Sequence, residues 1–177
     1  ATILSLEFKQ FAKDYSSQSS SPAEQLQTLN QYFGFIGPII RKHNGYIEKY
    51  ASNGLCAVFK KPKNAIYCAL ELEKSTDIFN RDYPKLPSIT PIIGIHGDRN
   101  SILGTMGEDE RMESAVISQT SVIANSVKRL TKQLKSKILV TSNTLSMTKN
   151  MIEVKSRYVG KYFLFNGKDI EEMQLFA

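Results

Sequence analysis

The stretch that decides the fold is residues 45–59, which read GYIEKYASNGLCAVF. An Asn-Gly pair, Asn53 and Gly54, separates two runs that are rich in β-branched, aromatic and apolar residues. Asn-Gly is a favoured centre for a two-residue type I′ turn because both central residues of that turn take positive φ. The stretch therefore predicts a β-hairpin turned at Asn53 and Gly54, with one strand on each side.

An amphipathic helix is predicted before this hairpin. Ser21 and Glu24 form the pattern of a capping box, with Pro22 at the first helical position. Pro38 lies inside the helical pattern and should kink or split it, and Asn44 should end it. Apolar residues at spacings of three and four mark one face of the helix: Leu26, Leu29, Phe33, Ile36 and Ile40.

The rest of the chain predicts further alternation of strands and helices. A helix capped by Asn64 should follow the hairpin, burying Ala65, Ala69, Leu72 and Phe79, and later helices are expected from about residue 121 and over 142–149. This order favours an α/β (α+β) sandwich on a ferredoxin-like βαββαβ core, with extra strands and a C-terminal hairpin turned at Asn166 and Gly167. Residues 2–12 are expected to form a first strand that runs into a turn or short helix. Further strands are expected over residues 89–97, 101–106, 112–117, 138–141, 158–165 and 170–176.

Composition is that of one globular domain over residues 1–177, with 41% hydrophobic residues. No apolar run is long enough for a membrane span and no signal peptide is visible. The chain opens at Ala1 directly into a strand-like run, so we expect a cytoplasmic domain excised from a larger signalling protein, whose parent could itself be membrane-anchored. The formal charge of +6 comes from scattered lysines, which argues against nucleic acid as a partner. Cys56 and Cys68 stand in apolar patterns and are expected to be reduced core thiols.

The hairpin stretch resembles the metal-bearing hairpin of class III adenylate and guanylate cyclases. The family pattern is Gly-Gly-x-Ile-x-Lys, an aromatic, an aliphatic and Gly-Asp-Gly, then an aliphatic, Met-Ala and an aliphatic-Phe pair. Further segments resemble the family in the same order, so the resemblance covers nearly the whole chain and implies the class III nucleotidyl cyclase fold. These segments are residues 3–12, 29–33, 94–97, 103–107 with Arg111, 124–132, 138–140, 159–160 and 166–168.

The resemblance also implies a chemistry. In the family, the ribose 3′-oxygen attacks the α-phosphate, and two Asp carboxylates hold two Mg²⁺ ions. An Asn and an Arg of the late helix orient the ribose and stabilise charge, and a Lys with an Asp or Thr reads the base. The site is shared by two subunits of a head-to-tail dimer, so a homodimer or a heterodimer with another cyclase-type domain is expected here.

Several family site positions carry other residues in this chain. The metal positions fall on Glu7 and Asn53, so no metal is expected, and Mg²⁺ or Mn²⁺ only if residual activity remains. The catalytic Asn and Arg positions fall on Val122 and Ser126, so no catalytic residue is expected. The phosphate-binding turn carries a glutamine at position 10 and an alanine at position 12. Lys128 or Arg129 could replace the Arg only after a register shift.

Base reading is half retained, because Lys49 stands at the family's purine-reading position while its partner position falls on Ala115. Lys49 is thus a possible purine contact, for which a solvated surface lysine is the alternative. His96 is expected to be a structural, hydrogen-bonded histidine. Arg111, placed in a loop before a strand, is expected to be a packing or ion-pair residue.

These replacements predict a degenerate, pseudoenzyme-type cyclase domain that is not an active enzyme and acts as a dimerising or regulatory module in cyclic nucleotide signalling. One alternative is a weakly active adenylate cyclase that makes cAMP from ATP with Mn²⁺ or Mg²⁺. Another is a regulatory domain that binds ATP, GTP or another anion through Lys49 and the basic loop at Lys60, Lys61 and Lys63. No direct membrane contact is expected.

Overall fold

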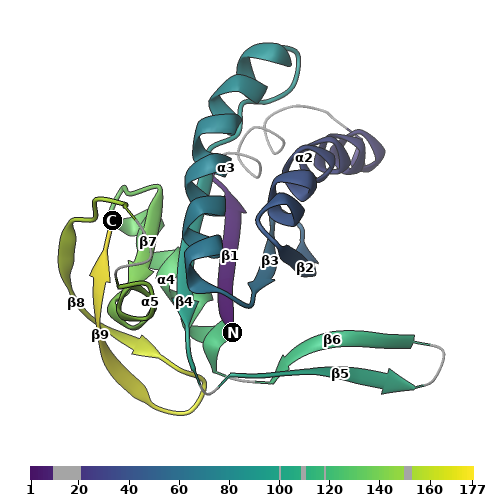
Figure 1. Cartoon of the computed structure of the whole chain (residues 1–177). Coiled ribbons are helices and arrows are strands. Elements are labelled where there is room, and N and C mark those ends of the chain that lie inside the picture. Colours follow the sequence, from purple (N-terminus) through teal and green to yellow (C-terminus); the bar gives the residue numbers. More distant parts are fainter. Residues whose placement is uncertain (10–20, 100, 109–110, 118, 150–152) are drawn as a thin grey trace.

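The computed structural model describes residues 1–9, 21–99, 101–108, 111–117, 119–149 and 153–177. The predicted features at residues 10–20, including the phosphate-binding turn, lie outside this description. The described strands form a seven-stranded sheet in the order β2-β3-β1-β4-β7-β9-β8 and a separate two-stranded arm, β5-β6 (Figure 1). The first four strands with α2 and α3 make the predicted βαββαβ unit, and the strand–helix alternation is confirmed.

The elements follow one another in an order close to the prediction. The strands are β1 (Thr2–Phe8), β2 (Gly45–Ala51), β3 (Gly54–Phe59), β4 (Pro91–Gly97), β5 (Ile102–Glu108), β6 (Arg111–Ile117), β7 (Ile138–Thr141), β8 (Tyr158–Phe165) and β9 (Ile170–Phe176). The helices are α2 (Pro22–Lys42), α3 (Pro62–Asp82), α4 (Thr120–Gln133) and α5 (Ser142–Met147).

Strand β1 is central, antiparallel to both β3 and β4. Its side chains alternate between the two faces of the sheet, as a strand's period of two requires. Leu4, Leu6 and Phe8 are buried in the main core with side chains of α2 and α3. Ile3 instead packs with Ala124 of α4, and Glu7 also contacts α4. The sheet therefore has an α2/α3 face and an α4 face.

Helix α4 lies unusually close to the sheet at Gly94 of β4. A Cβ atom at this position would overlap the backbone at Ala124 and Lys128. The Thr131 hydroxyl, farther along α4, donates to the Ile93 carbonyl oxygen at 3.2 Å and ties the helix to the same strand. Gly94 therefore lets α4 pack directly against β4. This contact determines how far the α4 side chains lie from the sheet.

The predicted hairpin exists, but its predicted turn was wrong. Strand β2 ends at Ala51 and pairs there with Gly54, so Ser52 and Asn53 form the two-residue loop. Neither Asn53 nor Gly54 has a left-handed φ. Gly54 is needed for a different reason: a Cβ there would overlap the Leu6 carbonyl oxygen of β1, so only glycine lets the two strands approach.

Three helix details also differ from the prediction. Pro38 lies within the single helix α2 and does not split it, and Leu26 is 60% exposed because it lies near the helix start, beyond the packed part. Helix α3 begins at Pro62 with Lys61 as N-cap, so Asn64 lies inside the helix and not at its cap. The residues predicted to be buried in α3, among them Leu72 and Phe79, are buried.

The C-terminal hairpin agrees with the prediction in both strands and in its turn. The Asn166 side-chain oxygen accepts from the backbone N–H groups of Lys168 and Asp169, and Gly167 takes φ +100°. Strands β5 and β6 pair with each other and extend away from the main sheet as an arm in Figure 1. Strand β5 continues to Glu108, where a loop was predicted, and Arg111 begins β6 where it was predicted to precede it.

Candidate active site on the α4 face

The site begins where β1 ends beside the β2–β3 loop. The Phe8 N–H donates to the Asn53 carbonyl oxygen at 2.8 Å, which holds the loop against the end of β1. Glu7 pairs in register with Gly54 on β3, and its side chain faces α4. Glu7 and Asn53, the two residues predicted to stand at the family's metal positions, thus lie at adjoining places in the sheet.

Two lysines of α4 meet the Glu7 carboxylate. The Lys128 ammonium lies 3.4 Å from Oε2 and the Lys132 ammonium 3.4 Å from Oε1. Their spacing of four places both side chains on one face of the helix. The Lys128 side chain is 15% exposed and the Lys132 side chain 54%, so one ammonium is enclosed and the other reaches solvent. The sequence analysis considered Lys128 only as a substitute for the family's Arg, and it missed both the pairing of Lys128 with Glu7 and the part of Lys132.

The neighbouring part of β2 adds more charge to the same face. A bulge between Ile47 and Lys49 brings the Glu48 carboxylate to Cys56, whose thiol donates to it at 3.5 Å. The pKa of Cys56 is raised to about 12, mainly by burial and in smaller part by the neighbouring Glu48 carboxylate. The positive charges of Lys128 and Lys49 act in the opposite direction on this pKa, so both lysines lie within electrostatic range of Cys56.

A two-metal centre of the family type does not fit these residues. The Glu7 carboxylate is already paired with two ammonium groups, and Asn53 contributes a neutral amide. Within the described ranges, no group of three or more His, Cys, Asp and Glu side chains is placed to hold a metal ion. The donor set therefore differs from the bridging carboxylates on which two-metal chemistry depends.

Val122 and Ser126 lie on the first turns of α4, away from Glu7. Val122 is 38% exposed. The Ser126 hydroxyl lies 3.1 Å from the Val122 carbonyl oxygen and 3.5 Å from that of Phe165, so it contacts its own helix and the C-terminal hairpin. Arg129 is exposed on α4. Of the two basic residues considered as substitutes for the family's Arg, the structure thus brings Lys128 to the site.

The remaining predicted residues lie apart. His96 is buried and hydrogen-bonded through Nδ1 to the Thr141 hydroxyl at 2.9 Å, which confirms a structural role. Burial lowers its pKa to about 4. Lys49 is exposed on β2, whereas Ala115 pairs with Gly104 in the separate arm, so their joint base-reading role stays a prediction. The Arg111 side chain lies outside the described part of the chain.

Both cysteines are free, and Cys68 is fully buried, in agreement with the predicted core thiols. Burial also raises the pKa of Cys68 to about 12. Among the helices of the described ranges, none combines the length and apolar character needed to cross a bilayer.

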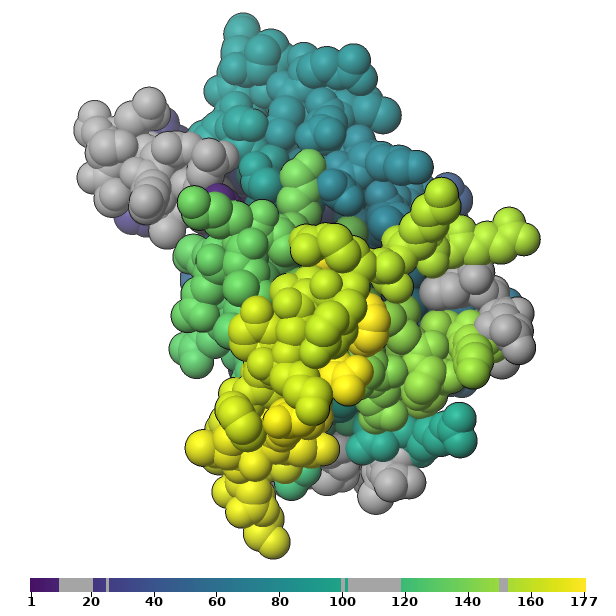
Figure 2. All heavy atoms as spheres, turned by 90° about the vertical axis from the view of Figure 1, so that its left-hand side faces the viewer, coloured from purple at the N-terminus to yellow at the C-terminus, as the bar shows by residue number. Residues whose placement is uncertain are grey.

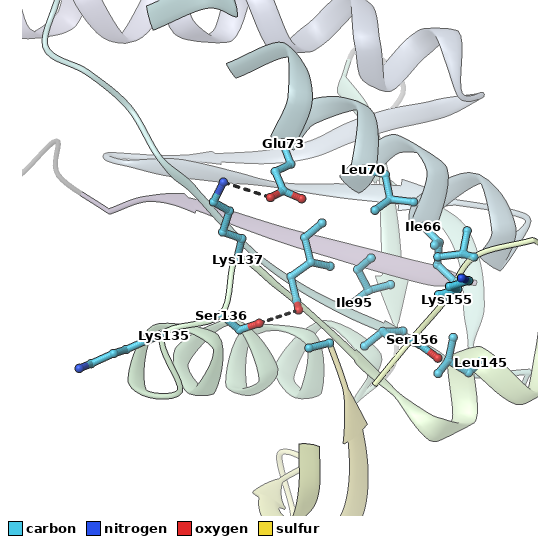
Figure 3. Close-up of a pocket in the computed structure, with 14 residues that line it drawn as sticks. Ile66, Leu70, Glu73, Ile95, Lys135, Ser136, Lys137, Leu145, Lys155 and Ser156 are labelled. Carbon is cyan, nitrogen blue, oxygen red and sulfur yellow. Dashed lines mark hydrogen bonds and ion pairs between the residues drawn. The ribbon is translucent and has the colours of Figure 1, made fainter. Parts of the chain in front are cut away.

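A pocket of about 350 Å³ lies on the α3 side of the sheet (Figure 3). Its lining includes Leu70 and Ile95, and apolar surface predominates in it. Glu73 and Lys137 pair at 3.1 Å at one end, and Lys135 points away from it in Figure 3. Lysines also line this pocket, namely Lys135, Lys137 and Lys155, but Glu7, Lys128 and Lys132 are not part of its lining.

Comparison with known proteins identifies adenylate cyclases that are similar in sequence to most of this chain. The chain is 29% identical to an adenylate cyclase of Anabaena cylindrica over 161 residues, or 86% of this chain and 32% of that protein. It is 23% identical to adenylate cyclase 1 of Rhizobium meliloti over 148 residues, or 78% of this chain and 22% of that protein. The chain thus spans less than a third of the length of these curated relatives. No family model matches it.

Solved structures agree on the fold. A bacterial light-regulated adenylyl cyclase superposes with a TM-score of 0.79 at 18% identity, covering 99% of this chain and 88% of that one. The adenylyl cyclase CyaB from P. aeruginosa gives 0.78 at 18% identity, covering 99% and 91%. The predicted fold class is therefore confirmed.

These relatives contradict the prediction that the domain is not an enzyme. The curated relatives are adenylate cyclases, and the structural neighbours are adenylyl and guanylyl cyclases. That prediction rested on the replaced family positions, namely Glu7, Asn53, Val122 and Ser126. It did not take into account that Lys128 and Lys132 place positive charge beside Glu7. The chain is a homologue of adenylate cyclases with the fold of class III cyclase catalytic domains.

Proposed function

We propose that this domain is a nucleotidyl cyclase of the adenylyl type, which converts ATP to cAMP slowly as part of a larger signalling protein. The observation that carries the proposal is the charged cluster at the end of β1. Glu7, the β2–β3 loop and α4 meet where the fold family has its reaction centre, and Lys128 and Lys132 supply positive charge there.

The reaction gives these lysines a task. A bond forms between the ribose 3′-oxygen and the α-phosphorus, the bond from that phosphorus to pyrophosphate breaks, and the 3′ proton passes to solvent. Negative charge grows on the phosphate oxygens, and fixed ammonium groups held by Glu7 are suited to stabilise it. Lys49, exposed on the adjoining β2, is the proposed contact to the base.

Impaired turnover is part of the proposal. Val122 and Ser126 stand at the positions of the family's Asn and Arg and supply no charge. Loss of one preorganised stabilising group commonly costs about 10²–10³ in rate. We therefore expect cAMP formation well below that of a cyclase with the full set of residues.

We also propose that the domain works as a dimer. Phe163, Phe165 and Ile170 expose large apolar side chains on the C-terminal hairpin, with exposed fractions of 74%, 53% and 71%. Phe165 and Ile170 are paired in register, so the exposed side chains are neighbours. Strands β8 and β9 lie on the face that Figure 2 presents, in yellow-green and yellow. An apolar surface of this kind is typical of protein interfaces.

The test is product analysis by mass spectrometry after incubation of the purified chain with ATP or GTP, with Mg²⁺, Mn²⁺ or a chelator. We expect cAMP from ATP above the level given by Glu7→Ala, because loss of Glu7 frees the two lysines from their fixed positions. Glu153→Ala, an exposed substitution far along the chain, should match wild type. Equal product from wild type and Glu7→Ala would point to a contaminating enzyme and refute the proposal.

A further inference from the structure

We infer that Lys128 and Lys132 bind the polyphosphate of a nucleoside triphosphate directly, in the place where the fold family positions a metal ion. The inference rests on the proposed function for the choice of ligand. It concerns a property that the proposed function leaves open, namely whether the ligand is bound with or without a divalent cation.

The charge balance of the α4 face supports this inference. Lys128 and Lys132 share the single carboxylate of Glu7, which leaves one positive charge in excess in this pairing. Nearby, Glu48 and Lys49 both act on Cys56 with opposite charges, so they do not change this balance. Each ammonium has three N–H donors, and a contact to one carboxylate oxygen leaves donors for phosphate oxygens. The cluster can therefore accept an anion without first losing the pairing that holds it in place.

The two lysines are suited to different parts of this task. Lys128 is largely enclosed, and charge interactions are stronger where water is excluded. Lys132 is half-exposed and can turn toward an arriving phosphate. Lysine is a well-established phosphate ligand that acts as a point charge, so it needs no bidentate geometry. A dication approaching Glu7 would instead be repelled by both ammonium groups.

Two consequences follow for binding. A chelator should leave nucleotide affinity intact, because the protein itself supplies the positive charge. Excess Mg²⁺ should weaken binding, because the magnesium complex of ATP carries less negative charge than free ATP. Rising salt should weaken binding as well, since the exposed Lys132 is screened.

The experiment is calorimetric titration of the whole chain with α,β-methylene-ATP, with EDTA or with excess Mg²⁺. Lys132→Met should weaken binding in EDTA by about tenfold or more, as expected for losing a hydrogen bond to a charged group. Glu7→Gln should tighten it, because the glutamine amide oxygen can still accept from the two ammonium groups and hold them, but no longer neutralises them. Lys74→Met, exposed on α3 at the other face of the sheet, is the matched control and should bind as wild type.

Binding that requires Mg²⁺ and is lost in Glu7→Gln would make Glu7 a metal ligand and overturn the inference. Absence of binding in EDTA, with every variant folded by circular dichroism, would overturn it too. The proposed function is judged separately by product formation. A chain that forms cAMP only with Mg²⁺ would keep the function and lose this inference, and binding in EDTA without any product would do the reverse.

Discussion

At the scale of single residues, burial determines how His96 behaves. Its ring is 2% exposed, and Nδ1 is bonded to the Thr141 hydroxyl, which lies 2.9 Å from the Thr144 hydroxyl. Thr144 in turn accepts from the Gly97 N–H at 2.8 Å. This chain of hydrogen bonds joins β4 to β7 and α5, and the imidazole within it is neutral because burial lowers its pKa to about 4.

His96 should make stability depend on pH. Between its ordinary pKa of 6.5 and the folded value of about 4, the unfolded chain binds a proton that the folded chain does not. The contribution of this group to stability is therefore complete above pH 6.5 and is lost as pH falls toward 4, by about 3 kcal/mol in all. Urea unfolding of wild type and His96→Asn at several pH values measures it.

Asparagine keeps a polar atom near Nδ1 but does not titrate, so the difference between the two unfolding free energies should narrow on acidification. Gly34→Ala, which changes no ionisable group and places its Cβ within 4 Å of no other atom, is the control and should retain the wild-type slope. If wild type and His96→Asn had the same slope, His96 would bind its proton equally in the folded and unfolded chains, and this would contradict the prediction.

At the scale of elements, the packing of α4 on β4 places the charged cluster. Gly94→Ala introduces a Cβ that overlaps the α4 backbone at Ala124 and Lys128. We expect a loss of about 1–3 kcal/mol of unfolding free energy, the usual cost of overpacking. Nucleotide binding should weaken as well, because α4 must move and carries Lys128 and Lys132 with it. Denaturant unfolding and calorimetry measure the two effects.

Gly34→Ala is the matched control for this prediction. A Cβ at Gly34 in α2 meets no atom within 4 Å, so alanine should stabilise the helix by roughly 0.5–1 kcal/mol. If Gly94→Ala were as stable as wild type and bound nucleotide equally well, then the close approach of α4 would not set the position of the lysines.

The two hairpins show which turns can be predicted from the sequence and which cannot. The same Asn-Gly pair occurs in both hairpins, and it predicted the turn at Asn166 and Gly167 but not the loop at Ser52 and Asn53. The first is decided locally by the Asn166 side chain and the positive φ of Gly167. The second is decided by β1, a strand far away in sequence that leaves no room for a side chain at Gly54.

The candidate site was predicted only in part for the same reason. The position of Glu7 beside the hairpin followed from the resemblance. The contact of Glu7 with Lys132, separated by 125 positions, depends on how α4 packs across the sheet, and periodicity within one segment carries no information on it. The structural role of His96 was predicted because the sequence has no second His or Cys at metal-ligand spacing from it, whereas its partner Thr141 lies on another strand and could not be named.

At the scale of the whole molecule, the exposed apolar residues of the C-terminal hairpin should mediate dimerisation. Phe163→Ser combined with Ile170→Ser should shift the chain from dimer to monomer in light scattering coupled to size-exclusion chromatography, because it removes apolar area that an interface would bury. Leu26→Ser, at a residue 60% exposed on α2, is the control and should leave the dimer unchanged. A wild-type chain that stays monomeric at high concentration would contradict the proposed dimer.

The measurement that tests the central claim most directly is the rate of cAMP formation from ATP as the concentration of the purified chain is raised. A cyclase whose site is shared by two subunits should show slow cAMP formation whose rate per chain increases with concentration and levels off once the dimer is saturated. Phe163→Ser with Ile170→Ser should lower this rate. If the folded, dimeric wild-type chain forms no cAMP with Mg²⁺, with Mn²⁺ or in EDTA, the account is contradicted.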